Sequence, residues 1–488
     1  MLFNSYAYIF AFLPVSIIGY FLAARLWGVK CSNIWLIAAS FFFYGYWNIH
    51  FLPLLIGSIL GNYALARCIM RYREAPQGIL TGRLFFALGM AFDIGMLCYY
   101  KYMDFLIANL NGLMGTQWAL WQVALPLGIS FFTITQMVYL VGVYFYGDGK
   151  KYRDFVDYVL FVSFFPHLLA GPILYHKTMM KQFKDESLHV PQAENLARGI
   201  ALFVIGLFKK VIIADALIMP VAEGFGHASG IGFWEGWSLA FLFMFQMYFD
   251  FSGYTDMAVG AARMMNIAIP INFNEPYKAK NLSDMWGRWH MSLTATITAY
   301  IYTPIMMTLK KITVWRSIAA LVLTMVIIGA WHGAGWTYVL FGALQGVALG
   351  INQLWKRSKS TPALPVWLSR TLTLGFMAAS CVLFRAENVP QAVEVYKGML
   401  GGRGFEWPYH LAEGGSLLSG VTVSGATLHD LPLLTLLLAT VLVSCCHDSN
   451  GTVKRMQPSL KWAFFLAALF VFSVLHFTQV TAFLYFQF

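Results

Sequence analysis

Long apolar runs separated by short, cation-bearing polar segments dominate the chain. A helix needs about 20 mostly apolar residues to cross the roughly 30 Å hydrocarbon core of a bilayer. By this measure the pattern predicts an all-α polytopic membrane protein with roughly eleven to twelve transmembrane helices. The predicted spans are Ala7–Leu26, Asn33–Trp47, Phe51–Met70, Leu84–Tyr100, Leu125–Tyr146, Ala197–Val221, Gly236–Phe251, Val314–Trp331, Trp336–Leu354, Leu372–Phe384, Leu431–Cys446 and Trp462–Phe486.

Two apolar stretches do not fit simple spans. The first, Phe155–Leu174, contains Pro166 and Pro172 and has cations at both ends, so we expect a re-entrant segment that enters and leaves on one side. In the second, Asn281–Thr308, one face repeats at three- and four-residue steps, which is typical of an amphipathic helix. We expect this helix to dip into the membrane. The residues on its face are Trp286, His290, Leu293, Ile297 and Ile301.

Lysines and arginines gather on one predicted side of the membrane, which the positive-inside rule makes the cytoplasmic side. Both termini then face outside, and the glycine-rich segment Ala386–Asp430 is a long outside loop suited to docking a partner. No Lys or Arg precedes Arg25, so we expect the first span to be retained rather than cleaved as a signal peptide. The cationic clusters are Arg25/Lys30, Arg67/Arg71/Arg73/Arg83, Lys150/Lys151/Arg153, Lys177/Lys181/Lys184, Lys278/Lys280/Arg288, Lys310/Lys311, Lys356/Arg357/Lys359 and Lys454/Arg455/Lys461.

Composition supports this picture and disfavours several classes of function. Of 488 residues, 59% are hydrophobic and 11% are charged, whereas soluble domains carry about 25% charged residues. The net charge of +11 therefore indicates cytoplasmic cations beside membrane lipid rather than nucleic-acid binding. The six cysteines lack metal-ligand spacing, and the chain has no P-loop, dinucleotide fingerprint or Gly-x-Ser-x-Gly elbow. We expect no metal and no bound cofactor.

One histidine lies at the bend between two predicted spans. His332 stands in Trp331-His332-Gly333-Ala334-Gly335-Trp336, where one apolar run ends and the next begins. Hydrocarbon offers an imidazole no hydrogen bond, so the side chain must be hydrogen-bonded to another residue or hydrated. An ionisable residue inside the membrane also suggests a functional role. On this stretch alone, a catalytic histidine and a structural one bonded to a neighbouring helix are about equally expected.

A second histidine, His290, lies in Trp286-Gly287-Arg288-Trp289-His290-Met291-Ser292. Imidazole titrates near neutral pH, so two histidines at one membrane site suit proton transfer. Taken alone, His290 fits an interfacial residue beneath a belt of tryptophans somewhat better than a catalytic one.

Two carboxylates fall in the otherwise apolar stretch Asp250-Phe251-Ser252-Gly253-Tyr254-Thr255-Asp256. They could orient a catalytic histidine or pair with Arg263 or Arg288. Structural ion pairing fits at least as well, because buried carboxylates need partners in any case. Asn274 adds a further polar side chain after this stretch.

Several motifs, in register along nearly the whole chain, resemble the bacterial membrane-bound O-acyltransferase (MBOAT) family. The closing segment Phe483-Leu-Tyr-Phe-Gln-Phe488 is similar to the alginate-acetylating branch of that family. The other motifs are Phe165-Pro-His-Leu-Leu-Ala-Gly-Pro-Ile173, Asp250-Phe-Ser-Gly-Tyr-Thr-Asp256, Phe273-Asn-Glu-Pro-Tyr277, Trp286-Gly-Arg-Trp-His290-Met-Ser-Leu293 and Trp331-His332-Gly-Ala-Gly-Trp336-Thr.

The resemblance implies a ring of helices with re-entrant segments around a central tunnel in the bacterial inner membrane. It implies that His332 and His290 are the family's two catalytic histidines. Acetyl-CoA or another acyl thioester would be the donor, and an extracytoplasmic polysaccharide or a periplasmic acetyltransferase partner would receive the acyl group. Residues expected to line the tunnel are Trp286, Trp289, Trp331, Trp336, Tyr254 and Asn274, and those expected in supporting or structural roles are Asp250, Asp256, Arg288 and Ser252.

By the same resemblance, residues 1–488 form one membrane domain, with N-terminal helices in 1–150, a catalytic core in 151–360, an extracytoplasmic loop in 386–430 and C-terminal helices in 431–488. One stretch departs from the alginate-type pattern. After Leu293 those proteins typically continue with Arg-Asp and then a Gly-Gly pair, whereas this chain reads Thr294-Ala-Thr-Ile-Thr-Ala-Tyr300-Ile-Tyr-Thr-Pro304. We therefore expect a divergent branch, with cellulose or another exopolysaccharide as acceptor.

Two further functions stay open from the sequence. A transporter or flippase would use the histidines as a proton relay, although no internal repeat is visible and the spans hold few acidic residues. An inactive scaffold would recruit an extracytoplasmic enzyme through Ala386–Asp430. The interpretation we favour is an O-acyltransferase in which His332 is the general base on an acceptor hydroxyl and tryptophans exclude water.

Overall fold

The computed structural model describes residues 1–75, 77–358, 364–405, 422–423, 426–427, 440, 447–477 and 483–484. The regular secondary structure of the described residues is helical, as predicted, apart from an isolated bridge between Gln77 and Leu80 and a short antiparallel pair of strands, β1 (Thr422–Val423) and β2 (Ala426–Thr427). The predicted span Leu431–Cys446 lies outside the described residues except for Thr440.

The chain forms two compact units. Unit 1 comprises Met1–Ile205 and Tyr254–Ile271, and unit 2 comprises Gly206–Gly253 and Asn272–Phe488. The boundaries between them fall inside two helices, α10 (Ala193–Phe208) and α12 (Phe233–Met264).

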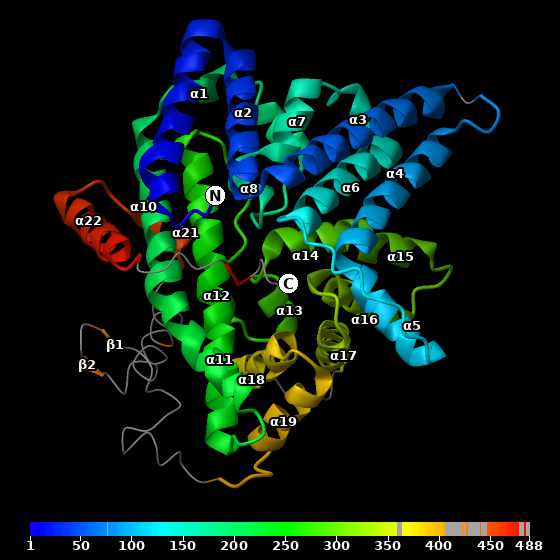
Figure 1. Ribbon diagram of the computed structural model, residues 1–488, viewed down its shortest axis with the longest axis vertical. Helices are drawn as coiled ribbons and strands as arrows, with labels where there is room; N and C mark the ends of the chain where they lie inside the picture. Colours follow the sequence, from blue (N-terminus) through cyan, green and yellow to red (C-terminus); the bar gives the residue numbers. More distant parts are fainter. Residues whose placement is uncertain are drawn as a thin grey trace. The chain divides into compact units, whose positions relative to one another are not determined.

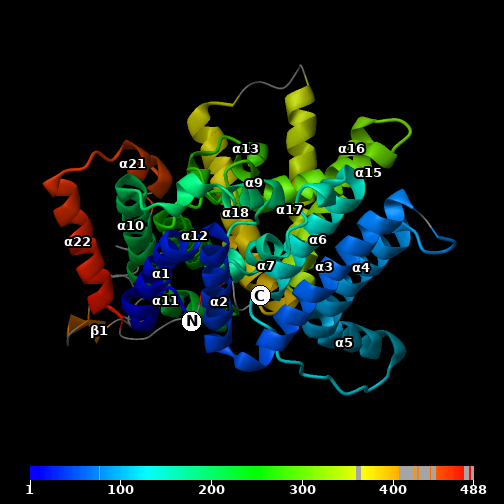
Figure 2. The ribbon, with the colours of Figure 1, turned by 90° about the horizontal axis from the view of Figure 1, so that it is seen from above.

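Unit 1 is built from long apolar helices joined by tight turns. The α1–α2 hairpin turns at Gly28, whose φ of 86° is a conformation that glycine adopts far more readily than other residues. Helix α4 packs against both α3 and α6 (Figure 1, Figure 2). The elements are η1 (Tyr8–Phe12), α1 (Leu13–Trp27), α2 (Val29–Trp47), η2 (Ile49–Phe51), α3 (Leu52–Glu74), α4 (Gly82–Leu97), η3 (Cys98–Tyr102), α5 (Met103–Met114), α6 (Ile129–Tyr146), η4 (Asp148–Lys150), α7 (Phe155–Ser163), α8 (Phe165–Leu168), α9 (His176–Gln182) and η5 (Glu186–His189).

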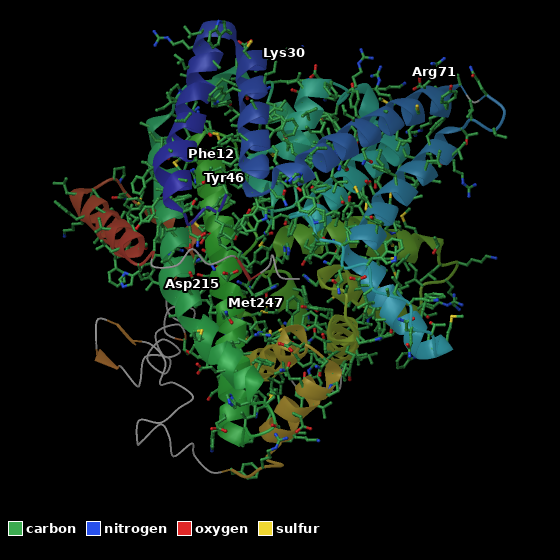
Figure 3. All side chains as sticks on the ribbon, viewed as in Figure 1. Phe12, Lys30, Tyr46, Arg71, Asp215 and Met247 are labelled. Carbon is green, nitrogen blue, oxygen red and sulfur yellow. The ribbon has the colours of Figure 1, made fainter. Side chains whose placement is uncertain are left out.

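Two cationic side chains of unit 1 lie towards the same end of its helices. Figure 3 shows Lys30, at the start of α2, and Arg71, near the end of α3, towards the top of the view, with Phe12 and Tyr46 further down. That all the cationic clusters share one side of the membrane stays a prediction.

The predicted re-entrant stretch Phe155–Leu174 is broken, as its prolines indicated. Asp154 caps α7 by accepting the N–H groups of Val156 and Asp157. Helix α7 ends at Ser163, and the four-residue helix α8 follows before the chain becomes irregular. Nearly all side chains of the stretch are buried, which is possible for irregular backbone inside a membrane protein only where protein surrounds it.

Unit 2 carries the histidine motifs. Its central hairpin, α16–α17, is packed so closely that a Cβ on Gly342 would lie 2.2 Å from the Met325 carbonyl oxygen. The elements are η6 (Lys209–Ala214), η7 (Asp215–Leu217), α11 (Ile218–Gly226), η8 (Pro276–Lys278), α13 (Leu282–Trp286), α14 (Met291–Ile297), η9 (Thr298–Tyr302), α15 (Thr303–Thr308), α16 (Val314–His332), α17 (Trp336–Arg357), α18 (Val366–Arg385), α19 (Val389–Met399), α21 (Ser449–Arg455) and α22 (Leu460–Leu475).

Six helices among the described residues are long and apolar enough to cross a membrane, and each overlaps a predicted span. They are Tyr8–Trp27, Ile49–Glu74, Gly82–Met114, Ile129–Tyr146, Val314–His332 and Val366–Arg385.

Two predictions about single elements are wrong. Asn281–Thr308 is not one helix, because α13 ends at Trp286 and the backbone reverses at His290 before α14 begins. Ala386–Asp430 is not loop throughout, because it opens with α19, which Asn388 caps by accepting the N–H of Gln391. Much of the remainder of that segment lies outside the described residues.

Candidate functional site

His332 is the last residue of α16, at the predicted bend. Its side chain is buried (6% exposed), and its ring centre lies 5.2 Å from that of Phe384 on α18. The next residue, Gly333, has an extended backbone, but a Cβ there would lie 2.2 Å from the Tyr338 ring. Glycine is therefore needed for space, and the bend between α16 and α17 holds the imidazole inside unit 2.

His290 is the turning point between α13 and α14. Its φ of 46° and ψ of 51° lie in the left-handed region, which is costly for a residue with a side chain. Asn272 fixes this turn, because its carbonyl oxygen accepts the Met291 N–H at 2.9 Å and its Oδ1 accepts the Ser292 hydroxyl at 2.6 Å. The imidazole is 1% exposed, with the Phe251 ring edge-on at 4.8 Å.

The surroundings of His290 keep it uncharged. Burial lowers the pKa of His290, which lies between the predicted spans, to about 3. At physiological pH the imidazole is therefore neutral and suited to positioning a partner through a hydrogen bond rather than through charge.

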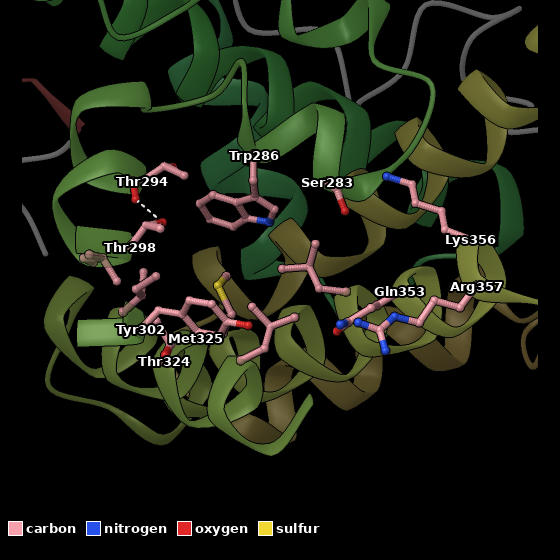
Figure 4. A pocket seen from close by; sticks show the side chains of 14 residues that line it. Ser283, Trp286, Thr294, Thr298, Tyr302, Thr324, Met325, Gln353, Lys356 and Arg357 are labelled. Carbon is pink, nitrogen blue, oxygen red and sulfur yellow. Dashed lines mark hydrogen bonds between the residues drawn. The ribbon is translucent and has the colours of Figure 1, made fainter. Parts of the chain in front are cut away.

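A cavity of about 460 Å³ lies within unit 2. In Figure 4 Trp286 stands over its middle, with Lys356 and Arg357 at one end and Thr294 and Thr298 at the other. Both cationic residues are exposed, so they form a mouth. The lining residues are Ser283, Trp286, Thr294, Ile297, Thr298, Tyr302, Leu321, Thr324, Met325, Ile328, Leu349, Gln353, Lys356 and Arg357.

This cavity joins the two histidine-bearing segments. Leu321, Met325 and Ile328 precede His332 by eleven, seven and four residues, which places them on the same face of α16 as the histidine. Trp286 and Thr294 stand four residues before and after His290. The segments that carry both imidazoles therefore line one largely apolar chamber with a cationic mouth.

Trp286 is held in place by Gln345, a residue that was not among the site residues predicted from the sequence. Its indole Nε1–H donates to Oε1 of Gln345 on α17 at 3.2 Å, and the Gln345 amide donates to the Ser380 hydroxyl on α18 at 2.8 Å. A glutamine in the middle of an apolar span was the available signal.

The four tryptophans predicted to line a tunnel occupy different surroundings. Trp286 and Trp289 are buried, and Trp289 packs on Phe273. Trp336 is 56% exposed. Of the four, Trp286 is the one among the residues lining this cavity.

Asp250 pairs with neither of the arginines considered from the sequence. Its Oδ1 binds the ammonium group of Lys210 at 2.6 Å, and the same ammonium binds Asp215 at 2.7 Å. Arg288 binds Asp284 instead, at 2.7 Å. Although partial burial opposes it, the hydrogen bond from Arg288 lowers the pKa of Asp284.

The other polar residues predicted near the site lie in both units. Ser252 accepts a hydrogen bond from Lys209 at 3.4 Å. Tyr254 and Asp256 belong to unit 1, where the Tyr254 hydroxyl accepts the Ala170 N–H at 3.3 Å and its ring stacks on Phe3. Asn274 is exposed, and its backbone N–H donates to the Arg288 carbonyl at 3.0 Å.

No metal centre is evident in the part of the chain that the structure describes, where no three His, Cys, Asp or Glu side chains are grouped to hold an ion. The described site contains two buried imidazoles on segments that line the apolar chamber, and neither histidine is itself among the lining residues.

Comparison with known proteins shows which family the sequence is similar to. The profile of the MBOAT, membrane-bound O-acyltransferase family matches residues 145–389. A peptidoglycan O-acetyltransferase of Helicobacter pylori is 35% identical over all of this chain and 98% of its own length. A probable alginate O-acetylase AlgI of Azotobacter vinelandii is 31% identical over the full length of both proteins. A teichoic acid D-alanyltransferase of Streptococcus thermophilus is 26% identical over 48% of this chain and 58% of its own.

Proposed function

The chain belongs to the membrane-bound O-acyltransferase family, and on this premise we propose that it moves an acetyl-sized acyl group from a cytoplasmic thioester to an extracytoplasmic glycan hydroxyl, directly or through a periplasmic partner. Multi-pass insertion in the membrane and O-acyltransferase activity follow from the family. Donor, direction of transfer and acceptor are the proposed parts, and the bacterial inner membrane is the proposed location.

The observation that carries the proposal is the chamber shared by the segments that bear His290 and His332. Lys356 and Arg357 at its mouth suit the phosphates of a CoA-type donor, because they stand on the predicted cytoplasmic side. The apolar lining around Trp286 would exclude water, which otherwise hydrolyses a thioester.

In the proposed reaction the acceptor hydroxyl gives its proton to the imidazole of His332 as its oxygen attacks the thioester carbonyl. The new C–O bond forms, the C–S bond breaks, and the leaving thiolate takes the proton back from the imidazole. General-base assistance of this kind is worth about 10²–10⁴-fold in rate. Neutral His290 would hold the donor carbonyl or the acceptor through a hydrogen bond.

The proposed acceptor is a cell-envelope glycan. Two relatives that match over the full chain are named for acetylating peptidoglycan and alginate, and both of those acceptors present sugar hydroxyls. The departure from the alginate-type pattern after Leu293 is a reason to test peptidoglycan fragments beside exopolysaccharides such as cellulose.

The test uses full-length protein in nanodiscs with labelled acetyl-CoA and isolated envelope glycans, and it measures both CoA release and label in the glycan. We expect His332→Ala to abolish release and His290→Ala to reduce it strongly. The control is His227→Ala, which changes an exposed histidine at the end of α11. Full release by a folded His332→Ala protein would overturn the mechanism, and flux of unmodified substrate into proteoliposomes that contain the protein would favour a transporter.

A further inference from the structure

Unit 1 contains a buried carboxyl group that the acyl-transfer chemistry does not use. Asp93, on α4, is 0% exposed, and its Oδ1 accepts the side-chain N–H of Asn62 on α3 at 2.8 Å. Within the described chain its Oδ2 has no hydrogen-bond partner. A carboxylate buried in this way carries a large desolvation cost unless a cation or several donors offset it.

The described cationic side chains on the neighbouring elements do not form ion pairs with Asp93. Helix α4 packs against α3, α6 and η3, and among the described residues none of their lysines and arginines forms an ion pair with it. Arg73 instead donates to the Val143 carbonyl, and Lys101 donates to Ser130. The cationic residues of these elements are Arg67, Arg71, Arg73, Arg83 and Lys101, and the titratable group facing Asp93 from α7 is the phenol of Tyr158.

The side chain of Asn62 also has a buried oxygen without a hydrogen-bond donor among the described residues. Its Nδ2 donates to Asp93, but its Oδ1 is also buried and without a partner among the described residues. The two side chains are hydrogen-bonded to each other, and yet one oxygen of each, Asn62 Oδ1 and Asp93 Oδ2, lacks a donor among the described residues. One proton on Asp93 Oδ2, donated to Asn62 Oδ1, would satisfy both and close the cyclic pair that a carboxylic acid forms with a primary amide.

We propose that Asp93 is a proton-binding site, held as a carboxylic acid paired with the amide of Asn62. The ligand is a proton rather than a metal cation, because hard cations take about six or more oxygens. Nearby oxygens are already engaged. The Ser58 carbonyl accepts from Asn62, the Ser58 hydroxyl accepts from Gln136, and the Gln136 carbonyl accepts from Tyr158.

That chain of hydrogen bonds gives the site a connection beyond the pair. It runs from Asp93 to Asn62, from Asn62 to the Ser58 carbonyl, and from the Ser58 hydroxyl through Gln136 to Tyr158, and so from α4 through α3 and α6 to α7. Loss of the proton would leave a charge at one end of this buried network, and we infer that the packing of these four helices depends on protonation of Asp93.

Infrared spectroscopy of the full-length protein in nanodiscs tests the site. We expect the wild-type spectrum at neutral pH to contain a carboxylic-acid C=O band that shifts in D₂O and is missing from Asp93→Asn. The control is Asp104→Asn on α5, because both side-chain oxygens of Asp104 accept backbone N–H groups, those of Trp121 and Gln122, at 2.7 and 3.0 Å. That variant should keep the acid band.

Thermal unfolding gives a second readout that does not depend on the band assignment. The wild type should lose stability as the pH is raised, because Asp93 is then forced to ionise, whereas Asp93→Asn should not show this loss. Absence of the acid band in the wild type would overturn the proposal. An unfolding midpoint that rises with added sodium only when Asp93 is present would overturn it in favour of a cation site.

Discussion

Trp286 and Gln345 are joined by a hydrogen bond from the indole Nε1–H to Oε1 across 3.2 Å. Because Gln345 also donates to Ser380, the pair ties the segment before His290 to α17 and α18. The bond is buried, so its loss leaves polar groups without partners and costs more than an exposed bond would.

Replacing Gln345 with leucine should therefore destabilise unit 2 and loosen the wall of the chamber. We expect a loss of about 1–3 kcal/mol in the free energy of unfolding and a rise in KM for the donor, measured by denaturant titration and steady-state kinetics. Trp286→Phe removes the other partner, and the double variant should cost less than the sum of the singles. Additive effects would show that the bond does not couple the two residues.

One substitution can distinguish the role of the His290 backbone in the turn from the role of its imidazole in the reaction. Glycine adopts the left-handed conformation of this residue without strain, so His290→Gly should keep the turn and the unfolding midpoint while losing most activity. His290→Ala loses the imidazole and keeps the strain. If His290→Gly retains wild-type CoA release, the imidazole has no role in the reaction and His290 serves only the turn.

Close packing of α16 on α17 predicts a steric result. Gly342→Ala would place a Cβ 2.2 Å from the Met325 carbonyl oxygen, so the two helices must separate. We expect a loss of about 1–3 kcal/mol, as for other overpacked sites, and reduced activity, since α16 ends in His332. Gly375→Ala on α18 is the control, because nothing lies within 4 Å of its added Cβ. Equal unfolding midpoints for the two variants would contradict the close approach.

The features of unit 2 that the sequence predicted depend on local signals. The bend at His332 follows from two apolar runs of membrane-spanning length separated by four residues, His332 to Gly335, two of them glycines. Run length and turn composition are properties of neighbouring residues, so they can be read without the fold.

The features that the sequence could not predict depend on distant partners. The apolar repeat of Asn281–Thr308 continues across His290, so periodicity alone indicates one helix. The break is stabilised by Asn272, which precedes His290 by 18 residues in the chain. Likewise Asp250 is conspicuous in its motif, but its partner Lys210 becomes visible only when η6 and α12 are brought together.

The cationic mouth of the chamber predicts that charge reversal there changes KM for the donor but not kcat. Lys356→Glu with Arg357→Glu should raise KM for acetyl-CoA about tenfold or more, since charged hydrogen bonds contribute roughly 1.5–3 kcal/mol each, while kcat at saturation changes little. The control, Lys310→Glu with Lys311→Glu, reverses two cations on the same predicted side that do not line the chamber. A similar rise in KM for both variants would indicate a general electrostatic effect rather than a donor site.

Lys210 should be among the most sensitive positions for stability. Its ammonium group is buried between Asp250 and Asp215, at 2.6 and 2.7 Å, and removing one member of a buried ion pair costs about 3–5 kcal/mol. We therefore expect Lys210→Met to lower the free energy of unfolding by this amount. Lys209→Met should have a much smaller effect, because Lys209 is less buried and bonds Ser252 at 3.4 Å. Addition of Asp250→Asn to Lys210→Met should recover part of the loss, and failure to do so would show that the two charges are not energetically coupled.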